Sequence, residues 1–125
     1  MLKNFEDLDA FQKAVDLSVA IYDATSSFPD DERYNLISQL RRASISVISN
    51  IAEGQGRLTE GEWRAFLSHA RGSLFEIQAQ LIVAVRLNLI DERKYRALRS
   101  SVIKAARPLS GLIAYVRRRE SQTDN

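Results

Sequence analysis

With 125 residues, the chain is long enough to form a single domain whose hydrophobic core needs no stabilising disulfide or metal. Hydrophobic residues make up 45% of the chain and charged residues 27%, which is typical of a soluble globular protein. The absence of cysteine excludes disulfides, zinc–thiolate sites and thiol catalysis.

The beginning of the chain shows no signal-peptide pattern. The longest apolar run, residues 81–85, is far shorter than the ~18–20 residues that a membrane span needs. We therefore expect a cytoplasmic protein that makes no contact with a membrane.

The net charge is only +2, but it is unevenly distributed. Residues 1–62 contain six basic and eleven acidic side chains, whereas residues 63–125 contain twelve basic and five acidic ones. The first half thus carries −5 and the second half +7. This asymmetry indicates either an anionic partner for the second half or two halves that pair with each other inside one bundle.

No alternating pattern or hairpin turn predicts a strand, so the expected fold class is all-α. The first predicted helix spans about residues 7–26 and has two adjacent apolar stripes, a wider apolar arc than a surface helix needs. One stripe contains Leu8, Phe11, Val15, Ser18 and Tyr22, and the other contains Ala10, Ala14, Leu17, Ile21 and Ala24.

The second predicted helix spans about residues 31–53, begins with three acidic residues that suit the helix dipole, and is expected to end at Gly54 and Gly56. Its core row is Leu36, Leu40, Ala43, Val47 and Ile51. Ile45 and Ile48 are hard to place in the same core as this row. Surplus apolar surface on a soluble domain usually marks an interface, so both isoleucines are predicted to lie at an oligomer interface.

The third predicted helix spans about residues 60–87 and begins with a capping box formed by Thr59 and Glu62. Gly72, in its middle, indicates either a close approach to another helix or a glycine that is merely tolerated. Its core row is Trp63, Phe66 or Leu67, Ala70, Leu74, Ile77, Leu81 and Ala84.

The fourth predicted helix spans about residues 92–119, with Asp91 as its N-cap and Pro108 inside it. Its core row is Tyr95, Leu98, Val102, Ala105 or Ala106, Leu109, Ile113 and Val116. Short connections make consecutive helices antiparallel. The prediction for residues 1–125 is therefore one domain, an up-down-up-down antiparallel four-helix bundle.

Several sequence motifs resemble those of a known family. They are F-x-D-L at residues 5–8, Phe28-Pro29, Q-L-R-R-A-x-x-S at 39–46, N-I-A-E-G-x-G-R at 50–57 and A-x-G-S-L-x-E at 70–76. Together they resemble the four-helix-bundle proteins encoded in intervening sequences of bacterial 23S rRNA genes, to which Avd, the accessory protein of diversity-generating retroelements, is related. The resemblance extends over about residues 5–116.

This resemblance implies a cytosolic bacterial protein that assembles as a homopentamer and has no enzyme activity. In the retroelement relative, a basic surface of the pentamer contacts RNA and the reverse transcriptase. RNA or DNA, and a protein partner such as a reverse transcriptase, are therefore the partners that the resemblance suggests.

The residues themselves offer little for catalysis. His69 is the only histidine, and a lone histidine is more often a structural polar residue than a base. The Glu-x-x-His repeat of di-iron bundles is absent, and no glycine-rich loop follows a strand. The expectation is a protein that is not an enzyme and has no cofactor or metal.

A polar row follows the second helix at spacings of three and four, so its members share one face. It consists of Gln39, Arg42, Ser46, Asn50 and Glu53. A buried polar group must find a hydrogen-bond partner or cost about 1–3 kcal/mol. We therefore expect Asn50 and Glu53 to tie this helix to Arg57 and to Ser73 on the third helix; a ligand pocket is the alternative interpretation.

Basic residues form rows on the last two helices, and such rows can neutralise phosphates. The predicted nucleic-acid-binding residues are Arg57, Arg64 and Arg71 on one stripe, Arg93, Arg96, Lys104 and Arg107 on a second, and Arg117, Arg118 and Arg119 at the end. No aromatic residue is expected on these stripes, which argues against stacking with single-stranded bases. The alternative is a scaffold that binds only proteins.

Overall fold

The structure is a computed structural model that describes residues 4–123, with the side chains of residues 33, 34 and 123 left out of the description. Four long helices account for most of it: α1 (Asp9–Thr25), α2 (Ser38–Gln55), α3 (Glu60–Arg86) and α4 (Glu92–Thr123). Shorter turns occupy Phe5–Asp7, Asp30–Glu32 and Arg33–Ile37. No strand is present among residues 4–123, so the all-α prediction is confirmed.

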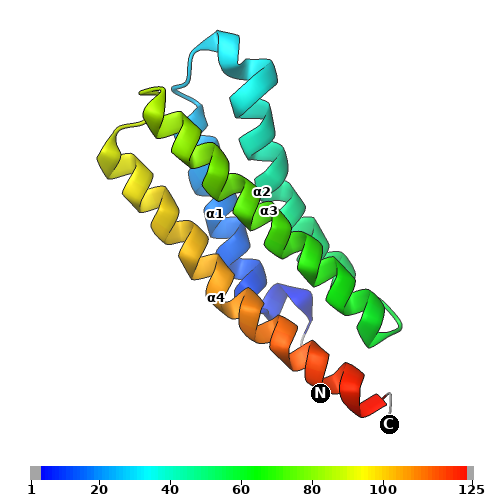
Figure 1. The fold of residues 1–125 in the computed structure, drawn as a ribbon. Coiled ribbons are helices and arrows are strands. Elements are labelled where there is room, and N and C mark those ends of the chain that lie inside the picture. The colour runs from blue at the N-terminus through cyan, green and yellow to red at the C-terminus, as the bar shows by residue number, and fades with distance from the viewer. Residues whose placement is uncertain (1–3, 124–125) are drawn as a thin grey trace.

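The helices lie side by side, and their connections alternate between the two ends of the molecule (Figure 1). The links from α1 to α2 and from α3 to α4 lie at one end, and the link from α2 to α3 lies at the other. Each helix packs along two neighbours, in the order α1, α2, α3, α4 and back to α1. The α1–α2 edge of the bundle is therefore opposite the α3–α4 edge.

The helix boundaries differ from the predictions mainly at the start of α2 and at the end of α4. A 3-10 turn and a wide π turn occupy residues 30–37, and regular α-helix begins only at Ser38. At the other end, α2 continues through Gly54 to Gln55, so Gly54 does not terminate it. α4 runs through Pro108 and extends to Thr123.

Thr59 and Asp91 cap the beginnings of α3 and α4 as the sequence predicts, although Glu62 accepts from the Thr59 hydroxyl and not from its amide. The Glu62 amide donates to Thr59 Oγ1 at 3.2 Å, and the Thr59 hydroxyl donates to Glu62 Oε1 at 3.2 Å. The Lys94 amide donates to Asp91 Oδ1 at 2.7 Å. Each cap satisfies an amide that the first helical turn leaves without a partner.

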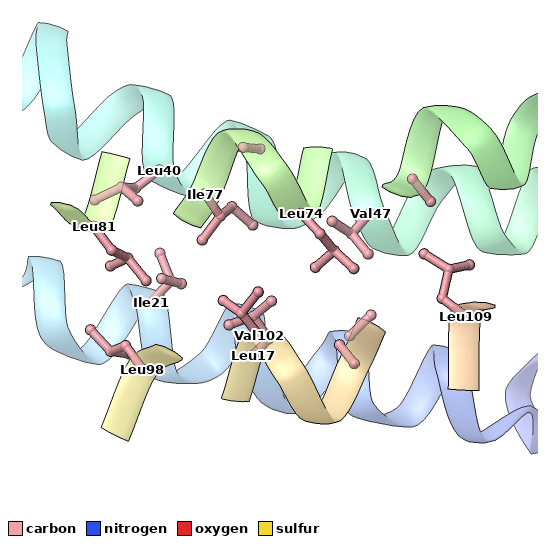
Figure 2. Packing of buried hydrophobic residues seen from close by; sticks show 14 of the residues in the cluster. Leu17, Ile21, Leu40, Val47, Leu74, Ile77, Leu81, Leu98, Val102 and Leu109 are labelled. Atoms are coloured by element: carbon pink, nitrogen blue, oxygen red, sulfur yellow. The ribbon is translucent and has the colours of Figure 1, made fainter. Parts of the chain in front are cut away.

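The core is a single apolar cluster to which all four helices contribute, as Figure 2 shows for Leu17, Leu40, Leu74 and Leu109 among others. The predicted core rows of α2, α3 and α4 are buried, apart from half-buried Tyr95. Where the prediction left two residues open, the buried one is Leu67 and not Phe66 on α3, and Ala105 and not Ala106 on α4. On α1 the stripe from Ala10 to Ala24 is buried. On the other α1 stripe, Ser18 is buried and Tyr22 is exposed, and the remaining residues are half-buried.

Polar contacts connect α1 to α2 inside the bundle. The hydroxyls of Ser18 and Ser44 share a buried hydrogen bond of 3.0 Å, and Ser44 also donates to the Arg41 carbonyl at 2.9 Å. Arg41 Nε donates to Thr25 Oγ1 at 2.9 Å. These hydrogen bonds satisfy groups that would be costly to bury alone.

Two of the helical glycines, Gly54 and Gly72, have roles that differ from those that the sequence suggested. A Cβ at Gly54 would lie 3.0 Å from Trp63 Cδ1 and 3.1 Å from Phe66 Cβ, so this glycine lets α2 approach α3 closely. A Cβ at Gly72 would meet no atom within 4 Å. Gly72 is therefore the tolerated glycine, and the close approach occurs at Gly54.

Candidate nucleic-acid interface

The predicted basic residues fall into four environments in the bundle. Two of them, Arg64 and Arg119, are paired with carboxylates of another helix. Another set covers the outer face of α4, where Arg93, Arg96, Lys104, Arg107 and Arg118 are exposed. The remaining set, Arg71 and Arg117, lines a groove between α3 and α4, and Arg57 lies in the α2–α3 connection.

The paired arginines join the beginning of α3 to the end of α4. Arg64 Nε donates to Glu120 Oε1 at 2.6 Å, and Arg119 Nη2 donates to Glu60 Oε1 at 3.1 Å. The hydrogen bond to Glu120 raises the pKa of Arg64, and hydrogen bonds to Tyr115 and then Glu60 raise the pKa of Arg119. Both guanidinium groups are already engaged within the bundle, so they are weaker candidates for phosphate contact.

The exposed residues of the outer α4 face are available to an anion. None of Arg93, Arg96 and Arg107 forms an ion pair with a described residue, and the same holds for Lys104. Ser100 lies among them and adds no charge. This face therefore presents unneutralised positive charge to solvent, which is the electrostatic requirement for binding a polyanion.

The groove between α3 and α4 adds a basic residue that the sequence rows did not include. It encloses about 350 Å³ and is lined by residues from both helices, including Arg71 and Arg99. A second depression of about 230 Å³ shares Arg71 and Ser110 with it and includes Arg117. Arg99 was missed because it lies on the groove side of α4, away from the row that contains Arg96 and Arg107.

Aromatic rings do accompany the basic residues, contrary to the sequence prediction. The Arg57 guanidinium carbon lies 4.3 Å from the centroid of the Phe66 ring. The corresponding distance from Arg71 to Phe75 is 5.1 Å. The prediction overlooked positions three or four residues from an arginine, which share its face of the helix. Arg71 and Phe75 are four residues apart on adjacent parts of the α3 surface, close enough for the side chains to meet.

The polar row lies along the contact between α2 and α3 and is half-buried rather than buried. Ser73 donates to Ser46 at 2.9 Å, and Asn50 donates to the Ser46 carbonyl at 2.8 Å and to its hydroxyl at 3.0 Å. Gln80 donates to Gln39 Oε1 at 3.4 Å. Ser73 thus contacts Ser46 rather than Asn50.

The ends of the row reach solvent. Glu53 and Arg57 form an exposed ion pair at 3.6 Å, and Arg42 is exposed. A shallow, open depression beside the row is lined by Ser46, Asn50, Ser73 and exposed His69, with no carboxylate among its lining residues. Gln39 and Ser46 therefore join α2 to α3, and Glu53 pairs with Arg57 as predicted, whereas the hydrogen bonds of Asn50 stay within α2.

The two isoleucines predicted at an oligomer interface differ in exposure. Ile45 is 44% exposed, whereas Ile48 is half-buried and packs against the core. Val19 on α1, 64% exposed, adds to the apolar surface of the bundle. Ile45 is therefore the residue of the predicted pair that is available to a partner.

Residues 4–123 include neither a candidate membrane span nor a candidate metal-binding cluster. Among the described residues, no helix is long and apolar enough to cross a membrane. No group of three or more histidine, aspartate or glutamate residues in that part of the chain could hold a metal ion.

A sequence model of the 23S rRNA-intervening sequence protein family matches residues 6–111, most of the chain. The chain belongs to this family. A solved structure with a similar fold is a protein of unknown function from the S23 ribosomal protein family of Bacteroides thetaiotaomicron VPI-5482. It has a TM-score of 0.77 at 17% identity, over 84% of this chain and 95% of that one. No curated protein matches the chain.

Three of the motifs that resemble the 23S rRNA-intervening sequence proteins, at residues 39–46, 50–57 and 70–76, contribute to the packing of α2 on α3. Gly54, from the motif at residues 50–57, lies against Trp63 and Phe66. Ser73, from the motif at residues 70–76, bonds to Ser46. In this family member, Gly54 thus permits a close helix contact and the Ser46–Ser73 hydrogen bond joins the two helices, whereas a Cβ at Gly72 would meet no atom within 4 Å.

Proposed function

We propose that this 23S rRNA-intervening sequence protein is a non-enzymatic, cytoplasmic, homo-oligomeric antiparallel four-helix bundle that binds RNA or DNA through the basic faces of α3 and α4. One observation carries the proposal: Arg93, Arg96, Lys104 and Arg107 are exposed on α4 and have no carboxylate partner among the described residues. If the +7 charge of the second half served only to balance the acidic half, these side chains would be paired within the bundle.

The ion pairs of the structure support this interpretation. Arg64 and Arg119 pair with Glu120 and Glu60, which lie at the same end of the bundle. The acidic residues of α1 are not among these partners. Most of the excess positive charge of the second half is therefore exposed to solvent. Its attraction for a polyanion should weaken as the salt concentration rises.

Self-association through the α1–α2 edge is supported by exposed apolar side chains. Val19 and Ile45 are 64% and 44% exposed. Apolar surface of this kind on a soluble bundle favours contact with another protein surface. The family resemblance supports a pentamer. The alternative function is a protein-binding scaffold or accessory subunit, in which the same edge would bind a protein partner such as a reverse transcriptase.

The test is the salt dependence of binding to structured RNA and to duplex DNA, with oligomer size measured by light scattering. We expect affinity to fall steeply as salt rises. The double variant Arg96→Glu/Arg107→Glu should weaken binding and reduce the slope of log K against log salt by about 2 for duplex DNA, because each phosphate contact contributes about 0.9. Oligomer size should not change.

A matched control makes the same change in charge elsewhere. Lys13→Glu/Arg42→Glu alters α1 and α2 by the same four units of charge and should have little effect on binding. If both double variants weaken binding equally, the effect is one of net charge and the α4 face is not the site. If a clean oligomer binds no nucleic acid at low salt, the scaffold interpretation replaces this proposal.

A further inference from the structure

The groove between α3 and α4 combines an apolar floor with positively charged walls. Leu74, Val102 and Leu109 form the floor and are buried, and the two adjoining depressions enclose about 350 and 230 Å³. The groove lies on the edge opposite α1 and α2, so the apolar surface around Ile45 does not cover it. It is therefore a second surface with a chemistry of its own.

Phe75 lies on this groove and is unusually exposed for an aromatic residue. Its relative accessibility is 62%, and the Arg71 guanidinium carbon lies 5.1 Å from the ring centroid. An exposed phenylalanine adds nothing to the core and leaves apolar surface in water. A flat ring beside a guanidinium is the arrangement on which an unpaired nucleobase stacks.

Three arginines follow the groove along its length. Arg99 and Arg117 are 18 positions apart on α4, which corresponds to about 27 Å at 1.5 Å per residue. Arg71 reaches the groove from α3 between them, beside Ser110. No carboxylate lines either depression. This spacing suits an extended chain of phosphates more than a single anion.

We infer that the α3–α4 groove binds an unpaired stretch of RNA or DNA, with a base stacked on Phe75 and phosphates held by Arg71, Arg99 and Arg117. The inference rests on the proposed nucleic-acid function and specifies the form of nucleic acid that the site takes. A duplex keeps its bases stacked internally and cannot present one to this ring.

An acidic amphipathic helix is the other occupant that an apolar, arginine-lined groove would suit. It would fill the groove but leave the outer α4 residues Arg96 and Arg107 without a role. A nucleic-acid strand uses both surfaces, because its phosphates continue beyond the groove. The extent of the positive charge therefore favours nucleic acid.

The experiment compares a short polyuridine oligonucleotide with a blunt RNA duplex of equal length by fluorescence anisotropy. Phe75→Leu keeps an apolar side chain but removes the ring, and we expect it to weaken oligonucleotide binding about tenfold or more while leaving duplex binding unchanged. Phe75→Tyr restores a ring and should bind like the wild type. Because Phe75 is largely exposed, neither variant should unfold the bundle.

A charge variant tests the phosphate contacts independently. Arg99→Gln should reduce the salt slope for polyuridine by about 0.7, the contribution of one phosphate contact to single-strand binding. An unchanged slope would remove Arg99 from the site. If Phe75→Leu binds polyuridine as tightly as the wild type does, the stacking inference is wrong, and retained duplex binding would then leave the proposed function standing.

Two further outcomes would also overturn the inference. If neither probe binds at low salt, the inference and the proposed function fail together. If a labelled acidic amphipathic peptide binds and loses affinity in Phe75→Leu, while polyuridine binding does not depend on Phe75, the groove is a peptide site.

Discussion

Replacing Gly54 with alanine should destabilise the bundle even though alanine is the better helix former. Gly54 is buried near the end of α2. An added Cβ would lie 3.0 Å from Trp63 Cδ1, 3.1 Å from Phe66 Cβ and 3.4 Å from the Trp63 carbonyl oxygen. Trp63 is only 5% exposed and its ring packs edge-on against Tyr115, so it has little room to move away.

The size of the effect follows from two opposing terms. Alanine is favoured over glycine in a helix interior by about 1 kcal/mol, and somewhat less near a helix end. Forcing an extra carbon into a packed contact costs about 1–3 kcal/mol. The expected net loss for Gly54→Ala is therefore about 1 kcal/mol. Gly72→Ala gains the helix propensity of alanine without the packing cost, because a Cβ there meets no atom within 4 Å.

The assay is chemical denaturation of wild type, Gly54→Ala and Gly72→Ala at one protein concentration, since oligomer formation would make stability depend on concentration. We expect Gly72→Ala to unfold at higher denaturant than the wild type and Gly54→Ala at lower. The two free energies of unfolding should differ by about 2 kcal/mol. If both variants are stabilised equally, α2 and α3 are not in tight contact at Gly54, and the packing explanation fails.

Other substitutions test the outer surface and the buried hydroxyls. Ile45→Asp should reduce oligomer size in light scattering with little loss of stability, whereas Ile48→Asp, at a half-buried position, should lower the denaturation midpoint. Ser44→Ala leaves the buried Ser18 hydroxyl without its partner and should cost about 1–3 kcal/mol in denaturation experiments. Adding Ser18→Ala to it should recover part of that loss; a further decrease would contradict this reasoning.

Sequence periodicity predicted most of the core because burial follows the 3.6-residue repeat on each helix. It worked best on α2, where the row from Leu36 to Ile51 is buried throughout. It could not choose between the two stripes of α1, since both are apolar, and only packing shows that Leu17 faces inward while Val15 lies nearer the surface. The roles of Gly54 and Gly72 also depend on a neighbouring helix, which a single sequence does not specify.

The candidate site was less predictable than the core. Rows of arginine were visible in the sequence, but their environments depend on contacts across helices. Arg64 pairs with Glu120, which is 56 positions away, whereas Arg96 has no such partner among the described residues. Arg99 joins Arg71 only because α3 and α4 pack together. A basic row by itself therefore could not distinguish a structural ion pair from an available phosphate contact.

The arrangement of the bundle separates the two proposed surfaces, and this separation has a measurable consequence. Self-association around Ile45 would occupy the α1–α2 edge and leave the α3–α4 groove of every subunit open. An oligomer would then offer several equivalent nucleic-acid sites at high effective concentration. A monomeric Ile45→Asp variant should therefore bind a short oligonucleotide as the wild type does, but bind a long one more weakly. Equal weakening for both lengths would mean that the groove itself depends on the oligomer.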